Sequence, residues 1–159
     1  NNNKLIYGGN FSKKKSKISP TLLKVKNQKD RLINDEIFGS LLPIMAIDNY
    51  QKAVEIIQCN SKPLAIYIFG GNKSIHKKIT KLTSSGTICI NDVMLPVLIP
   101  NLPFGGVGLS GMGKFHGEEG FKTFSNQKTV TKKSNFLDIN LRYPPYENLS
   151  KIINIIFKI

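Results

Sequence analysis

Several residue types are scarce in this sequence, and each shortage excludes a class of protein. Its 159 residues include two cysteines and no tryptophan. Two cysteines are too few for a small disulfide-rich domain and are compatible with a reducing compartment. No Cys/His cluster has the spacing of a zinc site, so no metal is expected. No apolar run reaches the roughly 20 residues that cross a bilayer, and the first four residues lack the pattern of a signal peptide.

Arginine is also scarce, although the formal net charge is +13. Of 23 cationic residues only Arg31 and Arg142 are arginine, the side chain that best recognises phosphates and guanine edges. We therefore expect no nucleic-acid partner. The densest cationic run, residues 13–15, fits a solvated surface loop, with a phosphate-contacting patch as the alternative. The length suffices for one domain with a hydrophobic core, and an opening without methionine fits a piece of a longer protein.

Hydrophobic periodicity up to residue 91 predicts strands that alternate with helices. Continuous apolar runs of strand length are separated by stretches whose apolar residues recur every three or four positions. This order predicts an α/β fold with a parallel β-α-β-α-β sheet unit. We expect a surface loop over 1–17, strands over 18–25, 41–47 (covered on both faces), 64–69 and 87–91, a helix beginning after residue 48 or 49, and a second helix over 72–82.

The pattern changes after residue 91. Three prolines exclude a central strand or helix from 94–103. Seven glycines in 105–120 predict irregular backbone, and 121–131 is expected to be extended. An extended tail over 134–148 is expected to lead to a short helix over 149–159. That helix is expected to dock on its own domain, with an interfacial helix as the alternative.

Two glycine motifs in the 105–120 stretch imitate nucleotide-binding signatures. Residues 106–111 satisfy G-x-G-x-x-G, but no strand precedes them and no acid follows about 20 residues later. Residues 108–114 satisfy G-x-x-x-x-G-K, but Phe115 stands where a phosphate-binding loop needs a hydroxyl. A glycine-rich turn that lets two backbone segments approach closely is the better interpretation. Cys59 and Cys89 are expected to be small buried hydrophobes, so the residues alone support no catalytic mechanism.

Five segments of the sequence are far more specific together than any single motif. They are 35–44 (DEIFGSLLPI), 62–70 (KPLAIYIFG), 84–93 (SSGTICINDV), 102–130 (LPFGGVGLSGMGKFHGEEGFKTFSNQKTV) and 142–146 (RYPPY). In this order and spacing they resemble the C-terminal part of an aldehyde dehydrogenase, over nearly the whole stretch from residue 7 to residue 146. The FHG after GMGK, the KTFSNQK segment and the RYPPY tail resemble the class 3, fatty-aldehyde-type branch.

The resemblance implies an enzyme that oxidises an aldehyde to a carboxylic acid with NAD or NADP. In the family a cysteine thiolate attacks the aldehyde, hydride passes to the nicotinamide, and a glutamate helps water hydrolyse the thioester. Glu36 matches the glutamate that binds the nicotinamide ribose, and Phe38 matches the phenylalanine beside the nicotinamide. The residues that match the substrate site, which suits an apolar aldehyde, are Phe104, Val97, Leu98 and His116. Asn91 falls beside the family's active site, where a structural role is as reasonable as a catalytic one.

The same resemblance implies a domain organisation. Residues 1–120 would be part of the catalytic α/β domain, 121–133 an oligomerisation strand used in a homodimer, and 134–159 a C-terminal tail. The family's nucleophile and general base would lie upstream, and neither Cys59 nor Cys89 matches the nucleophile. We therefore expect no catalytic residue in this chain and no activity from it alone. The alternative is a non-catalytic remnant that acts as an interaction module through 121–133.

Some residues depart from the family pattern, and some properties are implied only broadly. Ser40 replaces the usual proline of EIFGP, and Pro96 and Pro100 are expected to reshape the pocket wall. A cytoplasmic location is expected, with membrane association as a possibility, because the branch has both anchored and soluble members.

Overall fold

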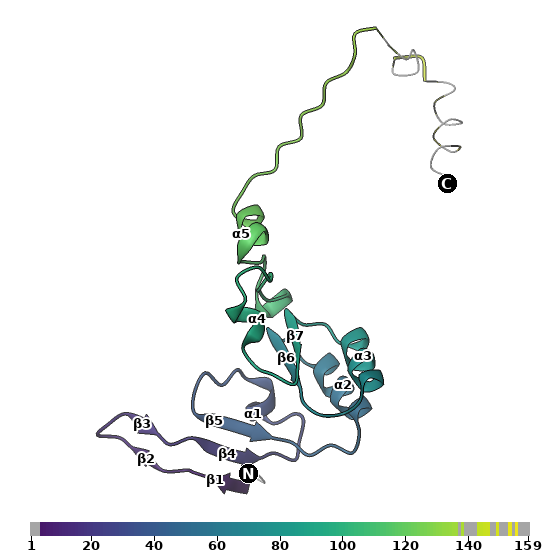
Figure 1. Cartoon of the computed structure of the whole chain (residues 1–159). Coiled ribbons are helices and arrows are strands. Elements are labelled where there is room, and N and C mark those ends of the chain that lie inside the picture. The colour runs from purple at the N-terminus through teal and green to yellow at the C-terminus, as the bar shows by residue number, and fades with distance from the viewer. Residues whose placement is uncertain are drawn as a thin grey trace. The chain divides into compact units, whose positions relative to one another are not determined.

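The computed structural model describes residues 4–136, 138, 143–146, 149, 153 and 155. The chain forms two units, residues 1–125 and residues 126–159, and every helix and strand discussed below belongs to the first (Figure 1). Most of the helix expected over 149–159 lies outside the described residues. Among the residues that are described, no helix combines the length and the apolar character needed to cross a bilayer.

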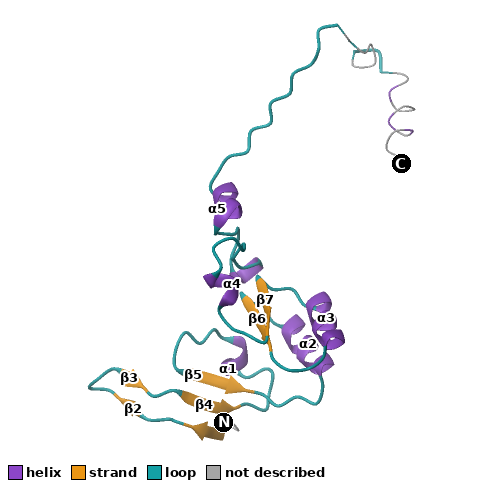
Figure 2. Cartoon of the chain, viewed as in Figure 1, coloured by secondary structure: helices purple, strands orange, loops and turns teal. Residues whose placement is uncertain are grey.

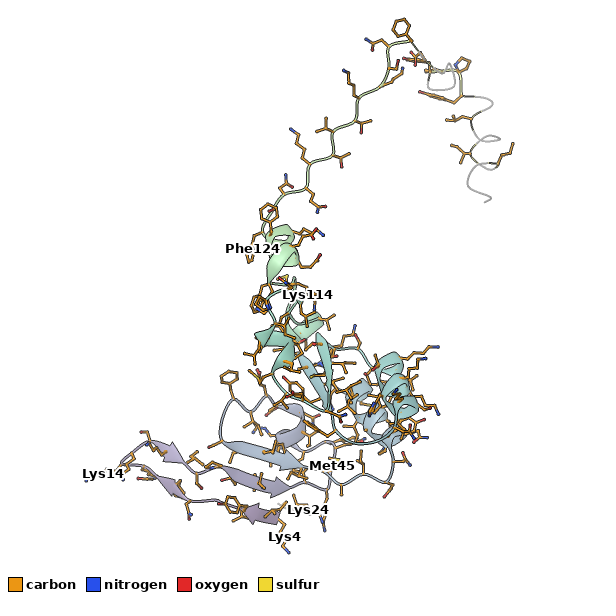
Figure 3. All side chains as sticks on the ribbon, viewed as in Figure 1. Lys4, Lys14, Lys24, Met45, Lys114 and Phe124 are labelled. Carbon is orange, nitrogen blue, oxygen red and sulfur yellow. The ribbon has the colours of Figure 1, made fainter. Side chains whose placement is uncertain are left out.

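The N-terminal part of the first unit is a three-stranded sheet with a projecting hairpin. Its order is β1 (Lys4–Tyr7), β4 (Thr21–Lys24) and β5 (Leu41–Ile44), with β1 antiparallel and β5 parallel to β4. The hairpin joins β2 (Phe11–Ser12) to β3 (Lys17–Ile18), with Lys14 at its tip (Figures 2 and 3). The expectation of a loop over 1–17 is therefore wrong. Strands of two to four residues are too short to show a clear apolar alternation, so a pattern of lysine and glycine does not reveal them.

The second part of this unit is a parallel strand pair covered by two helices. Strands β6 (Ala65–Ile68) and β7 (Thr87–Ile90) pair in parallel, and α3 (Lys73–Leu82) connects them. Helix α2 (Tyr50–Cys59) precedes β6. Asparagine caps both helices: the side chains of Asn49 and Asn72 accept hydrogen bonds from backbone N–H groups three residues later. Val54, Ile68 and Ile79 form the core between these helices and strands.

The α/β class is confirmed, and the strands expected in one sheet unit belong to two of the three sheets that the described residues form. Strand β5 pairs with β4, and the described residues contain no β5–β6 pairing. The expected parallel pairing is present in β4–β5 and β6–β7, but periodicity does not say which strands exchange hydrogen bonds, so the separation of β5 from β6 is not visible in the sequence. The expected coverage of 41–47 on both faces is also wrong, because Leu42 is 57% exposed. The core helices pack on the β6–β7 pair instead.

Three short helices occupy segments for which none was expected. Asp30 caps α1 (Arg31–Asn34) through its side chain. Helix α4 (Leu95–Leu98) contains Pro96 in its first turn. Backbone N–H groups in the first turn of a helix have no intrahelical acceptor, so a proline, which lacks this N–H, is tolerated there. The proline-based exclusion of a helix over 94–103 is therefore wrong.

The glycine-rich segment ends in a helix rather than in irregular backbone. A single 3₁₀ turn, η1 (Gly108–Ser110), lies within the segment, and α5 (Gly117–Thr123) closes it. The extended segment expected over 121–131 therefore does not begin at Phe121, because this residue lies in α5. Acidic residues in its first turn and Lys122 in its last suit the helix dipole, and this signal outweighs the helix-weakening glycines. Residues 126–134 belong to no helix or strand.

Candidate functional site

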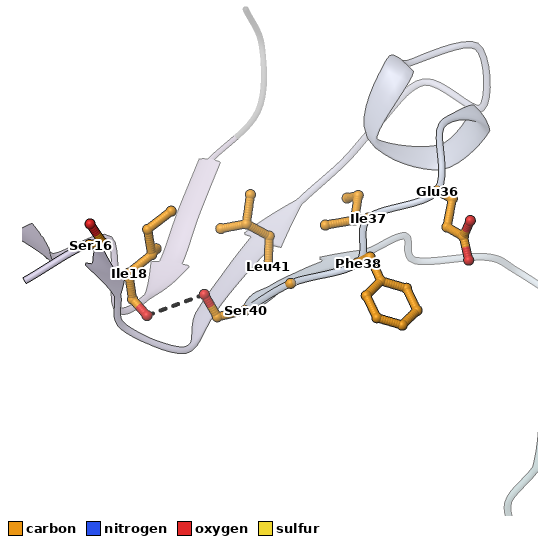
Figure 4. A pocket seen from close by; sticks show the side chains of 8 residues that line it. Ser16, Ile18, Glu36, Ile37, Phe38, Ser40 and Leu41 are labelled. Atoms are coloured by element: carbon orange, nitrogen blue, oxygen red, sulfur yellow. Dashed lines mark hydrogen bonds between the residues drawn. The ribbon is translucent and has the colours of Figure 1, made fainter. Parts of the chain in front are cut away.

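Glu36 and Phe38 lie on an exposed loop between α1 and β5. The loop borders a shallow depression of about 470 Å³, in which the two side chains project to the same side (Figure 4). Phe38 is 98% exposed, and Glu36 is also exposed. Ser40, at the end of the loop, donates a hydrogen bond from its hydroxyl to the carbonyl oxygen of Ile18 at 3.2 Å. The serine thus attaches this loop to the β2–β3 hairpin and partly replaces the rigidity that proline gives at this position.

Glu36 also borders a second cleft, of about 560 Å³. This cleft is lined by the end of α1, by the segment from the end of α2 to β6, and by Leu109 and Ser110 of the glycine-rich segment. Glu36 and Leu109, which line the same cleft, are more than 70 residues apart in sequence. The fold thereby brings one of the predicted cofactor residues next to the glycine-rich segment.

Phe104 and His116 lie together in an aromatic cluster that also includes Phe115. Phe104 and Phe115 form an isolated antiparallel bridge, with N–H to carbonyl distances of 3.0 and 2.8 Å. Their rings meet edge to face at 5.5 Å, and the His116 ring lies 4.1 Å from Phe115 and 6.2 Å from Phe104. All three side chains are partly exposed, so the cluster presents an aromatic surface rather than a closed core. The structure therefore joins two of the predicted substrate residues.

The other two predicted substrate residues, Val97 and Leu98, lie on α4. Val97 is half-buried and Leu98 is 67% exposed. A short chain of hydrogen bonds connects α4 to the aromatic cluster. The Leu102 N–H donates to the carbonyl of Ile99, the C-terminal cap of α4, and His116 Nδ1 lies 3.1 Å from the carbonyl oxygen of Leu102. Leu102 thus connects the end of α4 to His116 of the aromatic cluster through hydrogen bonds.

Sequence reasoning missed Lys114, which holds the cluster's loop in place. Its half-buried ammonium donates to the carbonyl oxygens of Gly105 at 2.6 Å and Gly86 at 3.3 Å. These backbones are very close, because a Cβ on Gly86 would lie 2.3 Å from the Gly105 carbonyl oxygen. The glycine-rich turn is therefore a close approach of two backbone segments, as the motif analysis expects. The G-K pair was a usable signal, although its lysine binds carbonyls rather than a phosphate.

Phe115 was also missed, and its only sequence signal is its position between Lys114 and His116. Asn91, which resembles an active-site residue, has a structural contact: its side-chain oxygen accepts from the Gly70 N–H at 3.3 Å. Its backbone φ of 60° is in the left-handed region that asparagine tolerates.

In the part of the chain that the structure describes, the remaining ionisable groups offer no reaction centre of their own. Cys89 is buried as expected, whereas Cys59 is exposed at the end of α2, contrary to expectation. Lys122 on α5 contacts Glu118 at 2.8 Å and Glu119 at 3.1 Å. The hydrogen bond from its ammonium, followed by its charge, lowers the pKa of Glu118, and the two glutamates in turn raise the pKa of Lys122. Within the described residues no three His, Cys, Asp or Glu side chains form a metal-binding group.

A partly exposed aromatic cluster and an exposed carboxylate beside a cleft lie on an α/β frame, and comparisons with known proteins show the family to which this frame belongs. The model of the aldehyde dehydrogenase family matches residues 1–130, so the chain belongs to the aldehyde dehydrogenase family. Among curated proteins it is similar to aldehyde dehydrogenase family 3 member I1, chloroplastic, of Arabidopsis thaliana, with 42% identity over 95% of this chain and 28% of that protein. This similarity confirms the resemblance to the class 3 branch.

Two further comparisons agree. The dimeric NADP-preferring aldehyde dehydrogenase of Rattus norvegicus is 39% identical over 91% of this chain and 32% of its own length. A solved structure, the substrate-bound state of Staphylococcus aureus AldH, superposes with a TM-score of 0.77 at 35% identity, covering 96% of this chain and 33% of that one. The chain thus spans about three tenths of the length of the curated relatives it matches.

Proposed function

We propose that these 159 residues are the portion of an NAD(P)-dependent aldehyde dehydrogenase that helps to hold the cofactor and lines the entrance for an apolar aldehyde. The observation that carries the proposal is the aromatic cluster of Phe104, Phe115 and His116, held beside α4 by backbone hydrogen bonds. A partly exposed surface of aromatic rings favours a fatty or aromatic aldehyde over a small polar one, because it removes apolar area from water.

The residues present fit a nicotinamide cofactor. Among the described residues, the carboxylate of Glu36 has no hydrogen-bond donor, so its oxygens are available to accept from the two hydroxyls of a ribose. The exposed ring of Phe38, on the same side of the loop, can pack beside a planar ring. When bound, the nicotinamide supplies the hydride acceptor. Glu36 would orient it so that donor and acceptor carbons meet in a reactive geometry.

We further propose that the nucleophilic cysteine and the general base come from residues outside this chain. Cys89 is buried in β7, and Cys59 lies at the end of α2. Neither matches the family's nucleophile. The chain alone should therefore be inactive toward every aldehyde. Activity that persists after Cys59→Ser and Cys89→Ser would contradict this.

The first experiment establishes the polypeptide in which the chain works. An antibody against a peptide covering residues 114–128 is used to measure the mass of the native product in source cells. A product several times heavier than 17.7 kDa is expected. A product of 17.7 kDa would instead favour the interaction module described below.

Two substitutions in the larger polypeptide then test the assigned roles. Glu36→Gln should lower kcat with little change in the dissociation constant of the cofactor. The matched control is Glu55→Gln on α2, which removes the same charge away from the cleft and should leave kcat unchanged. Phe104→Ala should lower kcat/KM for a long-chain aldehyde by about tenfold relative to a short one, and Phe69→Ala is its control. Equal losses for long and short aldehydes would refute the substrate role of Phe104.

A second candidate function has one observation in its favour. Residues 126–134 are exposed and pair with no strand among the described residues, so their backbone N–H and C=O groups are available to another chain. These residues contain most of the expected oligomerisation strand. The rat relative is named dimeric, and we propose that a homodimer uses this segment. If the chain exists alone, it would instead bind an intact dehydrogenase there, and co-purification from source cells tests this.

A further inference from the structure

The antiparallel ribbon formed by β1, β2, β3 and β4, residues 4–24, is rich in lysine and contains no acidic residue. Residues 1–29 contain eight lysines and no aspartate or glutamate. Six of these lysines lie in the ribbon: Lys4, Lys13, Lys14, Lys15, Lys17 and Lys24. None of the six forms an ion pair within the part of the chain that the structure describes. The ribbon therefore carries an uncompensated positive charge.

The arrangement of these lysines is costly for an isolated protein. Lys4 lies directly opposite Lys24 in the β1–β4 pair, and like charges in such positions destabilise a sheet. Three more lysines, residues 13–15, form the turn at the tip of the hairpin, at the other end of the ribbon (Figure 3). An anionic partner at the tip would relieve the repulsion among Lys13, Lys14 and Lys15.

The tip also carries exposed apolar side chains next to the charge. Phe11 and Ile18 are cross-strand partners in the β2–β3 pair, so their side chains lie on the same face. They are 70% and 56% exposed. A soluble anion would leave this pair in water, whereas the boundary between lipid headgroups and acyl chains accommodates both an apolar pair and lysines.

Hydrogen bonds hold the ribbon in this shape. At the tip the Ser16 N–H donates to the carbonyl of Lys13 at 3.2 Å. Between the tip and the sheet, the Ser19 N–H donates to the carbonyl of Asn10 at 2.9 Å, and the Gly9 N–H donates to the buried hydroxyl of Thr21 at 3.0 Å. Little conformational entropy remains to be lost on docking, which favours binding.

We propose that the ribbon tip docks onto an anionic lipid surface, with the Phe11–Ile18 pair at the acyl boundary and Lys13, Lys14 and Lys15 against the lipid phosphates. The ammonium of lysine acts as a point charge, which is sufficient to attract a lipid phosphate. Arginine is the side chain better suited to recognising nucleic acid, and the ribbon contains none. This proposal is independent of the dehydrogenase reaction.

The test is sedimentation of the full-length gene product with phosphatidylcholine vesicles that contain or lack phosphatidylserine. Each lysine near an anionic surface contributes about fivefold to partitioning. Replacing the three tip lysines (Lys13→Gln, Lys14→Gln and Lys15→Gln) should therefore weaken binding to the anionic vesicles on the order of 100-fold. Binding by the unchanged protein should also weaken as salt is raised.

A matched control separates the position of the charge from its amount. Lys73→Gln, Lys77→Gln and Lys81→Gln together remove the same charge from exposed positions on α3, and binding should fall by less than about fivefold. Phe11→Ser should weaken binding without changing the net charge, and circular dichroism verifies that each variant is folded. Equal losses for the two triple variants would overturn the proposal. So would absence of binding to anionic vesicles, or binding to homopolymer RNA instead.

Discussion

Lys114→Met removes an ammonium while keeping most of the apolar stem, and its effect can be worked out from the structure. The ammonium donates to Gly105 at 2.6 Å and to Gly86 at 3.3 Å. A hydrogen bond from a charged donor contributes about 1.5–3 kcal/mol, and the longer one contributes less. Because the site is half-buried and water can replace part of the contact, we expect a loss of about 2 kcal/mol in local stability.

The assay is hydrogen exchange at the Phe104 and Phe115 amides, which donate to each other's carbonyls. A loss of about 2 kcal/mol accelerates exchange by roughly 30-fold if these amides exchange through opening of this loop. Lys62→Met, at an exposed position, is the control and should change exchange by less than threefold, or about 0.5 kcal/mol. Lys114→Arg should retain part of the stability. Exchange in Lys114→Met within threefold of the unchanged protein would refute the assigned role of the ammonium.

Three further predictions concern individual positions. A Cβ on Gly106 would lie 2.0 Å from a backbone carbonyl oxygen, so Gly106→Ala should destabilise the loop by about 1–3 kcal/mol in urea unfolding. Asn72→Ala removes the cap of α3 and should cost about 1 kcal/mol in the same assay, whereas Thr80→Ala in mid-helix should cost less. Because the pKa of Glu118 is lowered in the folded protein, its contribution to α5 is present at neutral pH and lost as the pH falls through that lowered pKa. Lys122→Met should raise the pKa of Glu118 toward its ordinary value in an NMR titration.

The two long helices could be predicted because their signals are local. Asn49 caps α2 at one of the two positions expected for its start, and Asn72, expected as the first residue of the second helix, caps α3. Strands β6 and β7 were also predictable as short apolar runs. Their pairing follows from the rule that a helix connects parallel strands.

The ribbon and the sheet arrangement could not be predicted, because they depend on which strands pair with one another. Phe11 pairs with Ile18, and Lys4 pairs with Lys24, on neighbouring strands. The glycine- and lysine-rich sequence between these strands shows no apolar alternation that would indicate the pairing. The placement of Glu36 and Phe104 came only from resemblance to a family. The G-K pair draws attention to Lys114, but its two carbonyl partners come from segments whose closeness in space no spacing rule describes.

Pro43 has a consequence for how β5 meets other molecules. Ser40 and Ile44 accept hydrogen bonds from β4, and alternate residues of a strand face the same side, so Leu41 and Pro43 face the opposite side. On that side the described residues provide no partner strand. An approaching strand would therefore meet a carbonyl at residue 43 but no N–H. Edge strands that lack a donor resist uncontrolled pairing between molecules, so a single proline makes this edge of the sheet a poor template for polymerisation.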